Sequence, residues 1–187
     1  MRIEVVSPTD RKLKKTIAEF RKTNPGKTSN RSVDEQRIHD DKYCSDTDIS
    51  EWIVAVDDNK ISGTIAVFTR EITVDGQIVQ LGGIGKVRVA VDQRKKGIGN
   101  KLMKAAIQQL HDNQVDVAFL CTNLESFLAE WYKKYGFQIL PKQYTYTGAS
   151  DKKYIENNGM LAAIRSKDVF DNIMNSPETL DIGTGNW

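Results

Sequence analysis

Apolar and polar residues in the first half of the chain follow the alternation expected of a β-meander. Four segments have the pattern typical of strands: residues 2–6, 51–57, 60–74 and 77–91. Turn signals at Asp58-Asn59 and Asp75-Gly76 join the last three segments into an antiparallel meander. Glycines within residues 82–85 interrupt the last of these strands, which indicates a bulge or a close backbone approach there.

Other segments have the spacing of amphipathic or capped helices. They are residues 7–20, 32–40, 96–109, 124–135 and 166–176. Ser7 is the predicted N-cap of the first helix, with Pro8 in its first turn, and the segment Asn24-Pro25-Gly26 ends it. Ser32 and Glu35 predict a capping box for the second, polar helix.

The second half of the chain adds a buried strand and a C-terminal extension. Residues 115–122 form a continuous apolar run, which predicts a strand buried on both faces and parallel to the preceding strand, with a crossover helix between them. The rest predicts a strand or hairpin from FQIL and YTYT around Pro141-Lys142, a polar loop over 148–159, an apolar strand over 160–165 and an extended tail. We therefore expect an α/β (α+β) fold with a mixed central sheet, forming a single domain over residues 1–187, in which 148–187 is a C-terminal extension.

Composition narrows the class of protein. A hydrophobic content of 39% and a charged content of 28% are ordinary for a globular protein, and a net charge of +2 is too small to indicate nucleic-acid binding. No apolar run approaches the length of a membrane span, and the N-terminus has no signal-peptide core, so we expect a cytoplasmic protein. Two cysteines and two histidines, far apart in sequence, predict neither a disulfide framework nor a metal site.

The turn between the last meander strand and the next helix is a candidate anion site. Its R-x-x-G-x-G sequence consists of Arg94, Lys95, Lys96, Gly97, Ile98 and Gly99. Glycines let the backbone approach a ligand, and the N–H groups of a helix N-terminus attract anions such as phosphate. The spacing is neither that of a P-loop nor that of a Rossmann fingerprint. Taken alone, the turn is equally compatible with a solvated basic helix start.

The order of elements resembles the GCN5-related N-acetyltransferase (GNAT) family over about residues 50–140. The matching features are the meander, the strand ending in V-x-V, the R-x-x-G-x-G turn with its helix, the buried strand, and a late helix followed by Gly136-Phe137. The resemblance implies the GNAT fold, in which acetyl-CoA lies between two parallel strands that diverge. Here those strands end near Val91 and Thr122.

The resemblance also assigns cofactor-binding residues. It implies that the turn binds the pyrophosphate and that the backbone of Val87, Arg88 and Val89 pairs with the pantetheine arm. A strand N–H near Val89 would polarise the thioester carbonyl. Asn123, just after the second parallel strand, would face the pantetheine or the helix that follows.

Tyr132 is the candidate catalytic residue. The segment AEWYKKYGF matches a late motif of the family in which a tyrosine lies near the thioester sulfur, and Tyr132 holds that position. Its role would be that of a general acid for the leaving thiolate. The structural alternative is a tyrosine packed on the helix face with its hydroxyl in water. Tyr135 competes for the role, but we expect it to pack.

The general base is not assigned by the sequence. In aminoglycoside 2'-N-acetyltransferases, a subgroup of the family, the third meander strand carries a glutamate where this chain has Gly85, and no acid occurs from Gln77 to Val91. The base is therefore water, an acid within residues 34–48, or a carboxylate of the C-terminal part. Cys121 is expected to be an apolar core residue rather than a nucleophile.

The C-terminal extension resembles that same subgroup. The subgroup's extension also ends in a tryptophan, whose terminal carboxylate faces the substrate, so Trp187 is a candidate substrate-binding residue. A frayed tail with an exposed indole is the alternative. This chain departs from the subgroup at Gly185, where the subgroup has an acid.

Together these features predict an acetyl-CoA-dependent N-acetyltransferase. Its acceptor would be the primary amine of a small molecule, for which the subgroup suggests an aminoglycoside-like compound, and the amine would attack directly in a ternary complex. A non-catalytic acyl-CoA-binding module is the alternative from another class, and a nucleic-acid binder is a weaker third. We expect no nucleic-acid, membrane or metal partner, and the sequence leaves a homodimer open.

Overall fold

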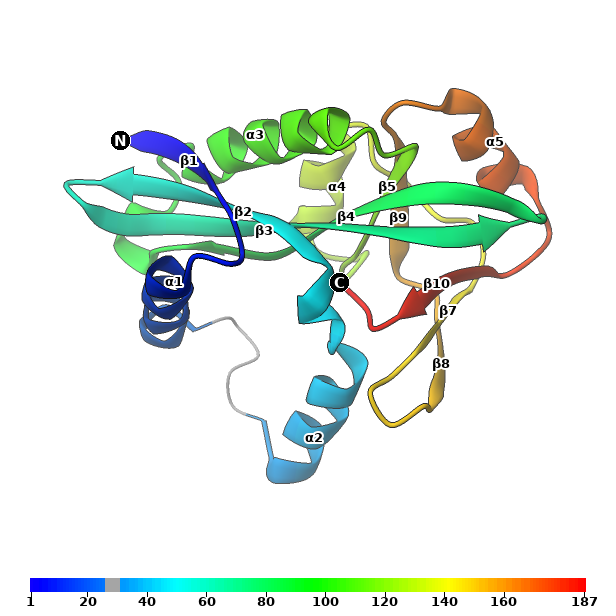
Figure 1. Ribbon diagram of the computed structural model, residues 1–187, viewed down its shortest axis with the longest axis horizontal. Coiled ribbons are helices and arrows are strands. Elements are labelled where there is room, and N and C mark those ends of the chain that lie inside the picture. Colours follow the sequence, from blue (N-terminus) through cyan, green and yellow to red (C-terminus); the bar gives the residue numbers. More distant parts are fainter. Residues whose placement is uncertain (26–30) are drawn as a thin grey trace.

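The computed structural model describes residues 1–25 and 31–187, which form two β-sheets with helices on both sides (Figure 1). The main sheet contains, in spatial order, β1 (Arg2–Val6), β2 (Ile49–Asp57), β3 (Lys60–Val74), β4 (Gln77–Val89), β5 (Val117–Cys121), β9 (Gly159–Ala163) and β6 (Gln138–Ile139). The smaller sheet contains β10 (Leu180–Thr184), β7 (Tyr144–Thr147) and β8 (Lys153–Glu156). Strands β1 to β4 are consecutive antiparallel neighbours, which confirms the meander.

Helices lie on both sides of the main sheet (Figure 1). They are α1 (Arg11–Thr23), α2 (Val33–Lys42), α3 (Ile98–Asp112), α4 (Phe127–Lys133) and α5 (Lys167–Asn175), with 3₁₀ turns η1 (Ser45–Asp48) and η2 (Val91–Gln93). One hydrophobic core packs α3 and α4 on the sheet, and the other packs α1, α5 and the small sheet on the opposite side. We call these two sides the α3 face and the α1 face. None of the helices in the described ranges has the length and apolar character needed to cross a membrane.

Helix starts follow the capping chemistry, with one correction. The prediction that Ser7 caps α1 is wrong: Asp10 is the N-cap, because its carboxylate accepts the Leu13 N–H at 3.0 Å. Ser7 instead bonds to Thr9 within the preceding turn, so the helix begins at Arg11. The predicted capping box of α2 is confirmed. The predicted breaking segment after α1 includes Gly26, which lies outside the described residues.

The C-terminal part is more regular than its sequence suggests. The predicted polar loop over 148–159 is wrong, because β8 lies within it and pairs antiparallel with β7. Of the predicted strand or hairpin from FQIL and YTYT, strands form in both segments but no hairpin joins them, because β6 pairs with β9 in the main sheet while β7 belongs to the small sheet. The tail contains β10, which pairs parallel with β7. These strands have two to five residues, which is too short for apolar alternation alone to identify them.

Candidate active site

Strands β4 and β5 diverge in the middle of the main sheet. They pair in parallel only where residues 81–83 lie beside 117–119. Beyond this point β4 remains paired with β3 as far as Val89, while β5 ends at Cys121. Within the described residues, the β4 edge from Ile84 to Val89 therefore has no strand partner. Such an edge can hydrogen-bond an extended ligand through its backbone.

A β-bulge interrupts β4 where the strands diverge. Ala66 pairs with Gly85 and Thr64 with Arg88, so two residues of β4 oppose one residue of β3. Lys86, inside the bulge, has a φ of 53°, and the Arg21 guanidinium donates a hydrogen bond to its carbonyl. The irregularity predicted from the glycines is confirmed. Bulges of this kind re-aim backbone groups beside ligand sites.

The turn after β4 presents an uncapped helix N-terminus. Gly97 is the N-cap of α3 with a φ of 79°, and no side chain caps the first N–H groups of the helix. A Cβ on Gly97 would meet nothing within 4 Å, so the backbone conformation, and not the space, calls for glycine here. Lys95 and Lys96 are exposed beside it. A 15-residue helix with free N–H groups and flanking cations fits an anionic group such as a pyrophosphate.

Helix α4 places Tyr132 on the α3 face near the end of β5. Its side chain is 7% exposed and packs near the rings of Trp131 and Phe137. Burial, with a smaller contribution from the Cys121 thiol, raises the pKa of Tyr132 well above its ordinary value. The hydroxyl therefore stays protonated at neutral pH, as a general acid requires.

Two predicted residues near α4 have structural partners. The Asn123 side chain accepts the Glu125 N–H at 3.0 Å, so it shapes the turn that leads into α4. Tyr135 and Trp131 both donate hydrogen bonds to the Asn100 side chain, at 3.1 and 2.7 Å. Asn100 lies in the first turn of α3, so this bridge fixes α4 against the anion-binding turn.

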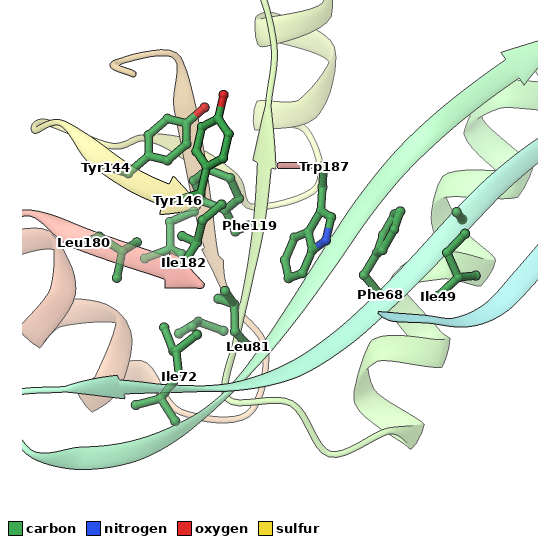
Figure 2. Close-up of a cluster of buried hydrophobic side chains, with 14 of the residues drawn as sticks. Ile49, Phe68, Ile72, Leu81, Phe119, Tyr144, Tyr146, Leu180, Ile182 and Trp187 are labelled. Atoms are coloured by element: carbon green, nitrogen blue, oxygen red, sulfur yellow. The ribbon is translucent and has the colours of Figure 1, made fainter. Parts of the chain in front are cut away.

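The tail brings Trp187 to the α1 face of the cleft. Its side chain is 6% exposed and stacks on Phe68 with ring centroids 5.3 Å apart (Figure 2). The Arg70 guanidinium lies 4.3 Å from the indole centroid. A Cβ on Gly83 would come within 2.0 Å of the indole, so the close backbone approach predicted for this strand is against Trp187. The packed arrangement, and not the frayed tail, is what the structure shows.

Hydrogen bonds tie the tail to segments far away in sequence. Asn186 donates its side-chain amide to the Tyr144 hydroxyl at 3.0 Å and its backbone N–H to the Lys42 carbonyl at 2.7 Å. The Ser45 hydroxyl donates to the Asn186 carbonyl at 2.9 Å, and Arg70 donates to the Gly185 carbonyl at 3.3 Å. The tail is thus held by α2, η1, β3 and β7 together.

The space beside Gly85 is already filled. A Cβ there would lie 3.0 Å from the Phe68 ring and 3.4 Å from the main-chain carbonyl carbon of Trp187. A side chain at this position would require the Phe68 ring to shift by a few tenths of an ångström. The position at which the aminoglycoside subgroup carries an acid is therefore crowded in this chain.

Cys121 lies between Tyr132 and the tail. Its thiol donates to the Trp187 carbonyl oxygen at 2.7 Å and lies 3.8 Å from the Tyr43 hydroxyl. Burial raises the pKa of the Cys121 thiol from 9.0 to about 11. Burial is also the largest cause of the raised pKa values of Tyr43 and Tyr144. The end of β5 is thus a partly buried polar centre, and not only the apolar core position that the sequence predicts.

Glu156 is the carboxylate that acts on this centre. Its side chain accepts from the Lys42 ammonium at 2.6 Å and from the Tyr146 hydroxyl at 3.4 Å, and its charge contributes to the raised pKa of Cys121. The acids predicted within 34–48 have partners of their own, as Glu156 does, or lie on the exposed surface. Asp41 accepts from Tyr154 and Ser150, Asp46 pairs with Lys86, Asp48 pairs with Arg70, and Asp34, Glu35 and Asp40 are exposed.

Sequence reasoning missed most of the residues around Cys121. The alternation in YTYT could have placed Tyr144 and Tyr146 on one face of a strand, and both are buried. No sequence signal connects Tyr43 or Glu156 with Cys121, because the segments meet only through the tertiary fold. Cavity size does not reveal the site either, since a cavity of about 490 Å³ lies between β3 and β10, away from Tyr132. The described residues contain no cluster of histidine, cysteine or acid side chains that could hold a metal ion.

A protein-family model described as an acetyltransferase (GNAT) domain matches residues 17–140. A search of curated proteins finds no match. Among solved structures, the chain is similar to the GNAT family N-acetyltransferase YhbS from Escherichia coli in complex with CoA, with a TM-score of 0.61 and 17% identity, covering 98% of this chain and 88% of that one.

Two further structures share the fold. The NatC complex bound to Gag peptide and CoA matches with a TM-score of 0.55 and 20% identity, over 87% of this chain and 99% of that one. A GNAT family acetyltransferase from Brucella melitensis in complex with acetyl-CoA matches with a TM-score of 0.51 and 20% identity, over 73% and 83%. These likenesses confirm the predicted mixed α/β GNAT fold, whereas nothing in them supports an aminoglycoside-like extension. The family model covers more than half of the sequence, and this chain therefore belongs to the GNAT acetyltransferase family.

Proposed function

We propose that this protein transfers the acetyl group of acetyl-CoA to the primary amine of a small molecule, by direct attack of the amine in a ternary complex. The observation that carries the proposal is the divergence of β4 and β5 beside the uncapped N-terminus of α3, with Tyr132 buried near the end of β5. Family membership supports it, as do relatives solved with CoA or acetyl-CoA.

The cofactor would lie along the unpaired edge of β4. The backbone of Val87, Arg88 and Val89 would hydrogen-bond the pantetheine arm, and a β4 N–H near Val89 would polarise the thioester carbonyl. The turn residues from Arg94 to Gly99 would bind the pyrophosphate through α3 N–H groups and side-chain cations. Asn123 would border the arm from the end of β5.

Tyr132 would act as the general acid. The amine attacks the thioester carbonyl, the C–N bond forms, and the C–S bond breaks as the tetrahedral intermediate collapses. The Tyr132 hydroxyl gives its proton to the departing thiolate. Its raised pKa keeps that proton in place until sulfur becomes negatively charged.

Glu156 would act as the general base. An alkyl amine has a pKa near ~10.4 and is protonated at neutral pH, so it must lose a proton before it attacks. Gly85 carries no acid, and Glu156 is a carboxylate whose charge acts on the Cys121 thiol, which bonds to the tail. Trp187 would form one wall of the acceptor site through its indole ring and main-chain carbonyl.

Two measurements test this proposal. Calorimetric titration should show binding of acetyl-CoA, and absence of binding would refute the cosubstrate. Release of the CoA thiol in the presence of a panel of primary amines should then report turnover. Tyr132→Phe should lower kcat by about a hundredfold with acetyl-CoA affinity unchanged, and Tyr135→Phe is the matched control. An unchanged kcat in Tyr132→Phe would remove this residue from the mechanism.

A non-catalytic acyl-CoA-binding module is the second candidate. The filled space beside Gly85 favours it, because an acid is missing where a related enzyme carries one. This candidate predicts tight acetyl-CoA binding without thiol release for every amine tested, including amines that bind to the protein–CoA complex.

A further inference from the structure

The side chain of Arg88 lies on the α1 face, although its backbone belongs to the strand edge proposed for pantetheine. Its neighbours Val87 and Val89 pack against the core of the α3 face. Side chains alternate along a strand, and Arg88 is in register with Thr64, whose strand neighbours Ala66 and Phe68 belong to the α1-face core. The backbone of Arg88 therefore lies on the β4 edge proposed for pantetheine, while its guanidinium lies on the side of the sheet opposite α3.

Among residues 1–25 and 31–187, the Arg88 guanidinium has no counter-ion. The side chain makes no hydrogen bond or ion pair with these residues, and its Nε atom is buried without a partner. Burial, together with the charge of Arg94, lowers the pKa of the Arg88 guanidinium. A half-buried cation without a partner is unfavourable, and a bound anion would relieve the cost.

Arg21 lies beside Arg88 and is held rigidly. Its guanidinium donates to the Lys86 carbonyl and lies 5.9 Å from the centroid of the Trp52 ring. Burial, followed by repulsion from Arg88, lowers the pKa of Arg21 to about 10. Asp46 is the nearby acid, and it already binds the Lys86 ammonium at 2.7 Å. The charge of Arg88 therefore acts on Arg21 more strongly than the opposite charge of Asp46 does.

We propose that Arg21 and Arg88 bind a carboxylate or phosphate group of the acceptor, so that the substrate is an amine carrying an anionic group. The planar guanidinium matches the geometry of both anions. This inference rests on the proposed function, in which the acceptor reaches the cleft from the α1 face. Arg88 lies three positions after Gly85, which is about 10 Å of strand at most, so a short chain would join the amine to the anion.

The cofactor pyrophosphate is a second source of the same anion chemistry, because Arg94 is close to Arg88. The acceptor is favoured because Arg21 and the Arg88 side chain lie on the α1 face, whereas the uncapped helix belongs to the α3 face. A polycationic acceptor such as an aminoglycoside would be repelled by the pair.

Calorimetry on the CoA-saturated protein tests the proposal without requiring turnover. The probes are β-alanine, γ-aminobutyrate and ε-aminocaproate, with O-phosphoethanolamine as the phosphate analogue, each compared with an alkylamine of matched length. At least one anionic amine should bind about tenfold more tightly than its neutral counterpart. Arg88→Gln should abolish this preference. Arg11→Gln, exposed at the start of the same helix as Arg21, should leave it unchanged.

Reversing the charge at Arg88 should create a new binding preference, which a misfolded variant could not show. Arg88→Glu should shift the preference from amino carboxylates to diamines such as putrescine. Equal binding of neutral and anionic amines by the unaltered protein would overturn the proposal. A tenfold loss of CoA affinity in Arg88→Gln, with the anionic preference retained, would assign the guanidinium to the cofactor and also overturn it.

The outcome separates this inference from the transferase proposal. Carboxylate-dependent binding that is lost in Arg88→Gln, without thiol release from acetyl-CoA, would support the anion site and refute the transferase. Acetylation of alkylamines and amino carboxylates with equal kcat/KM would support the transferase and overturn the anion site.

Discussion

The two sides of the β4–β5 cleft are built in different ways. The proposed cofactor side is one continuous stretch of chain, from β4 through the Gly97 turn into α3, and its geometry comes from local backbone conformation. The proposed acceptor side is assembled from α2, η1, β3, the end of β5, the β7–β8 hairpin and the tail. Its contacts join residues that are up to 141 positions apart.

This difference has an energetic consequence. Local conformations on the cofactor side can be changed with little effect on the core, so we expect such changes to act mainly on cofactor affinity. The acceptor side contains the buried Trp187, Tyr144 and Phe119 cluster, which is also part of the main hydrophobic core. Changes there should act on the stability of the whole fold as well as on catalysis.

Two tryptophans, one on each side, give the largest expected contrast. Trp187→Ala removes a buried indole that packs on Gly83, Phe68 and Arg70, and should lower the free energy of unfolding by about 3–5 kcal/mol. Trp131→Ala removes a half-buried indole next to Gly99 and should cost only about 1 kcal/mol, while weakening CoA binding several-fold. Urea denaturation and CoA titration measure the two effects.

An equal loss of stability in the two variants would show that the two sides of the cleft contribute equally to the stability of the fold. A loss of CoA affinity in Trp187→Ala, measured under conditions where the variant is folded, would place the tail on the cofactor side instead.

Glu156 gives the next largest effect, which should fall mainly on catalysis, with a smaller loss of stability because its ion pair with Lys42 is weakened. Glu156→Gln keeps the size of the side chain but removes the charge that receives the amine proton, so kcat/KM for the acceptor should fall by about a hundredfold. The affinity for acetyl-CoA should stay within about twofold, because Glu156 belongs to the other side of the cleft. Glu178→Gln, an exposed change in the same part of the chain, is the control. Unchanged kcat/KM would exclude Glu156 as the base.

The same difference between the cofactor side and the acceptor side determined which features the sequence could predict. The R-x-x-G-x-G turn was recognisable because its chemistry is contiguous and because Gly97 has a φ that other residues rarely adopt. The meander and the parallel β4–β5 pair followed from hydrophobic patterns and turn residues. The N-cap of α1 was misplaced because Ser7 and Asp10 are both good caps and only packing decides between them.

The acceptor side was largely beyond sequence reasoning. Gly85 predicted a missing acid, but it could not show that Phe68 and Trp187 occupy the space. The strand that ends at Glu156 has too few apolar residues to be recognised, and its partner β7 was expected in a different pairing. Contacts such as Cys121 with the tail carbonyl depend on a chain path that periodicity does not encode.

Gly97 and Gly76 both have a positive φ, and together they test whether the turn before α3 binds the cofactor. Gly97 and Gly76 have φ values of 79° and 76°, and a Cβ on either would meet nothing within 4 Å. Alanine at either position should therefore cost about 1–2 kcal/mol of stability. Gly97→Ala should also weaken CoA binding, because the strained turn holds the N–H groups of α3, whereas Gly76→Ala should leave CoA affinity unchanged. Equal CoA affinities in the two variants would exclude the turn from cofactor binding.

The smallest expected effect tests whether water is excluded from the Cys121 thiol on the acceptor side. Burial raises the pKa of the Cys121 thiol from 9.0 to about 11, so the thiol ionises in the unfolded chain before it ionises in the folded protein. The stability contributed by the protonated thiol is complete below the unfolded pKa and is lost as pH rises from about 9 to about 11. At about pH 10 the loss attributable to this group should be on the order of 1 kcal/mol.

Cys121→Ser isolates that loss, because a serine hydroxyl does not ionise in this range. The buried tyrosines also lose stability at high pH, but burial is the largest cause of their raised pKa values and acts in both proteins, so most of that loss cancels in the difference. Urea denaturation from about pH 8 to about pH 10 should therefore show the stability of the unaltered protein falling toward that of the variant. A difference that stays constant with pH would mean that water reaches the thiol. In that case the acceptor side would be as open as the cofactor side, and its tyrosines would lose the low-dielectric setting on which the proposed chemistry depends.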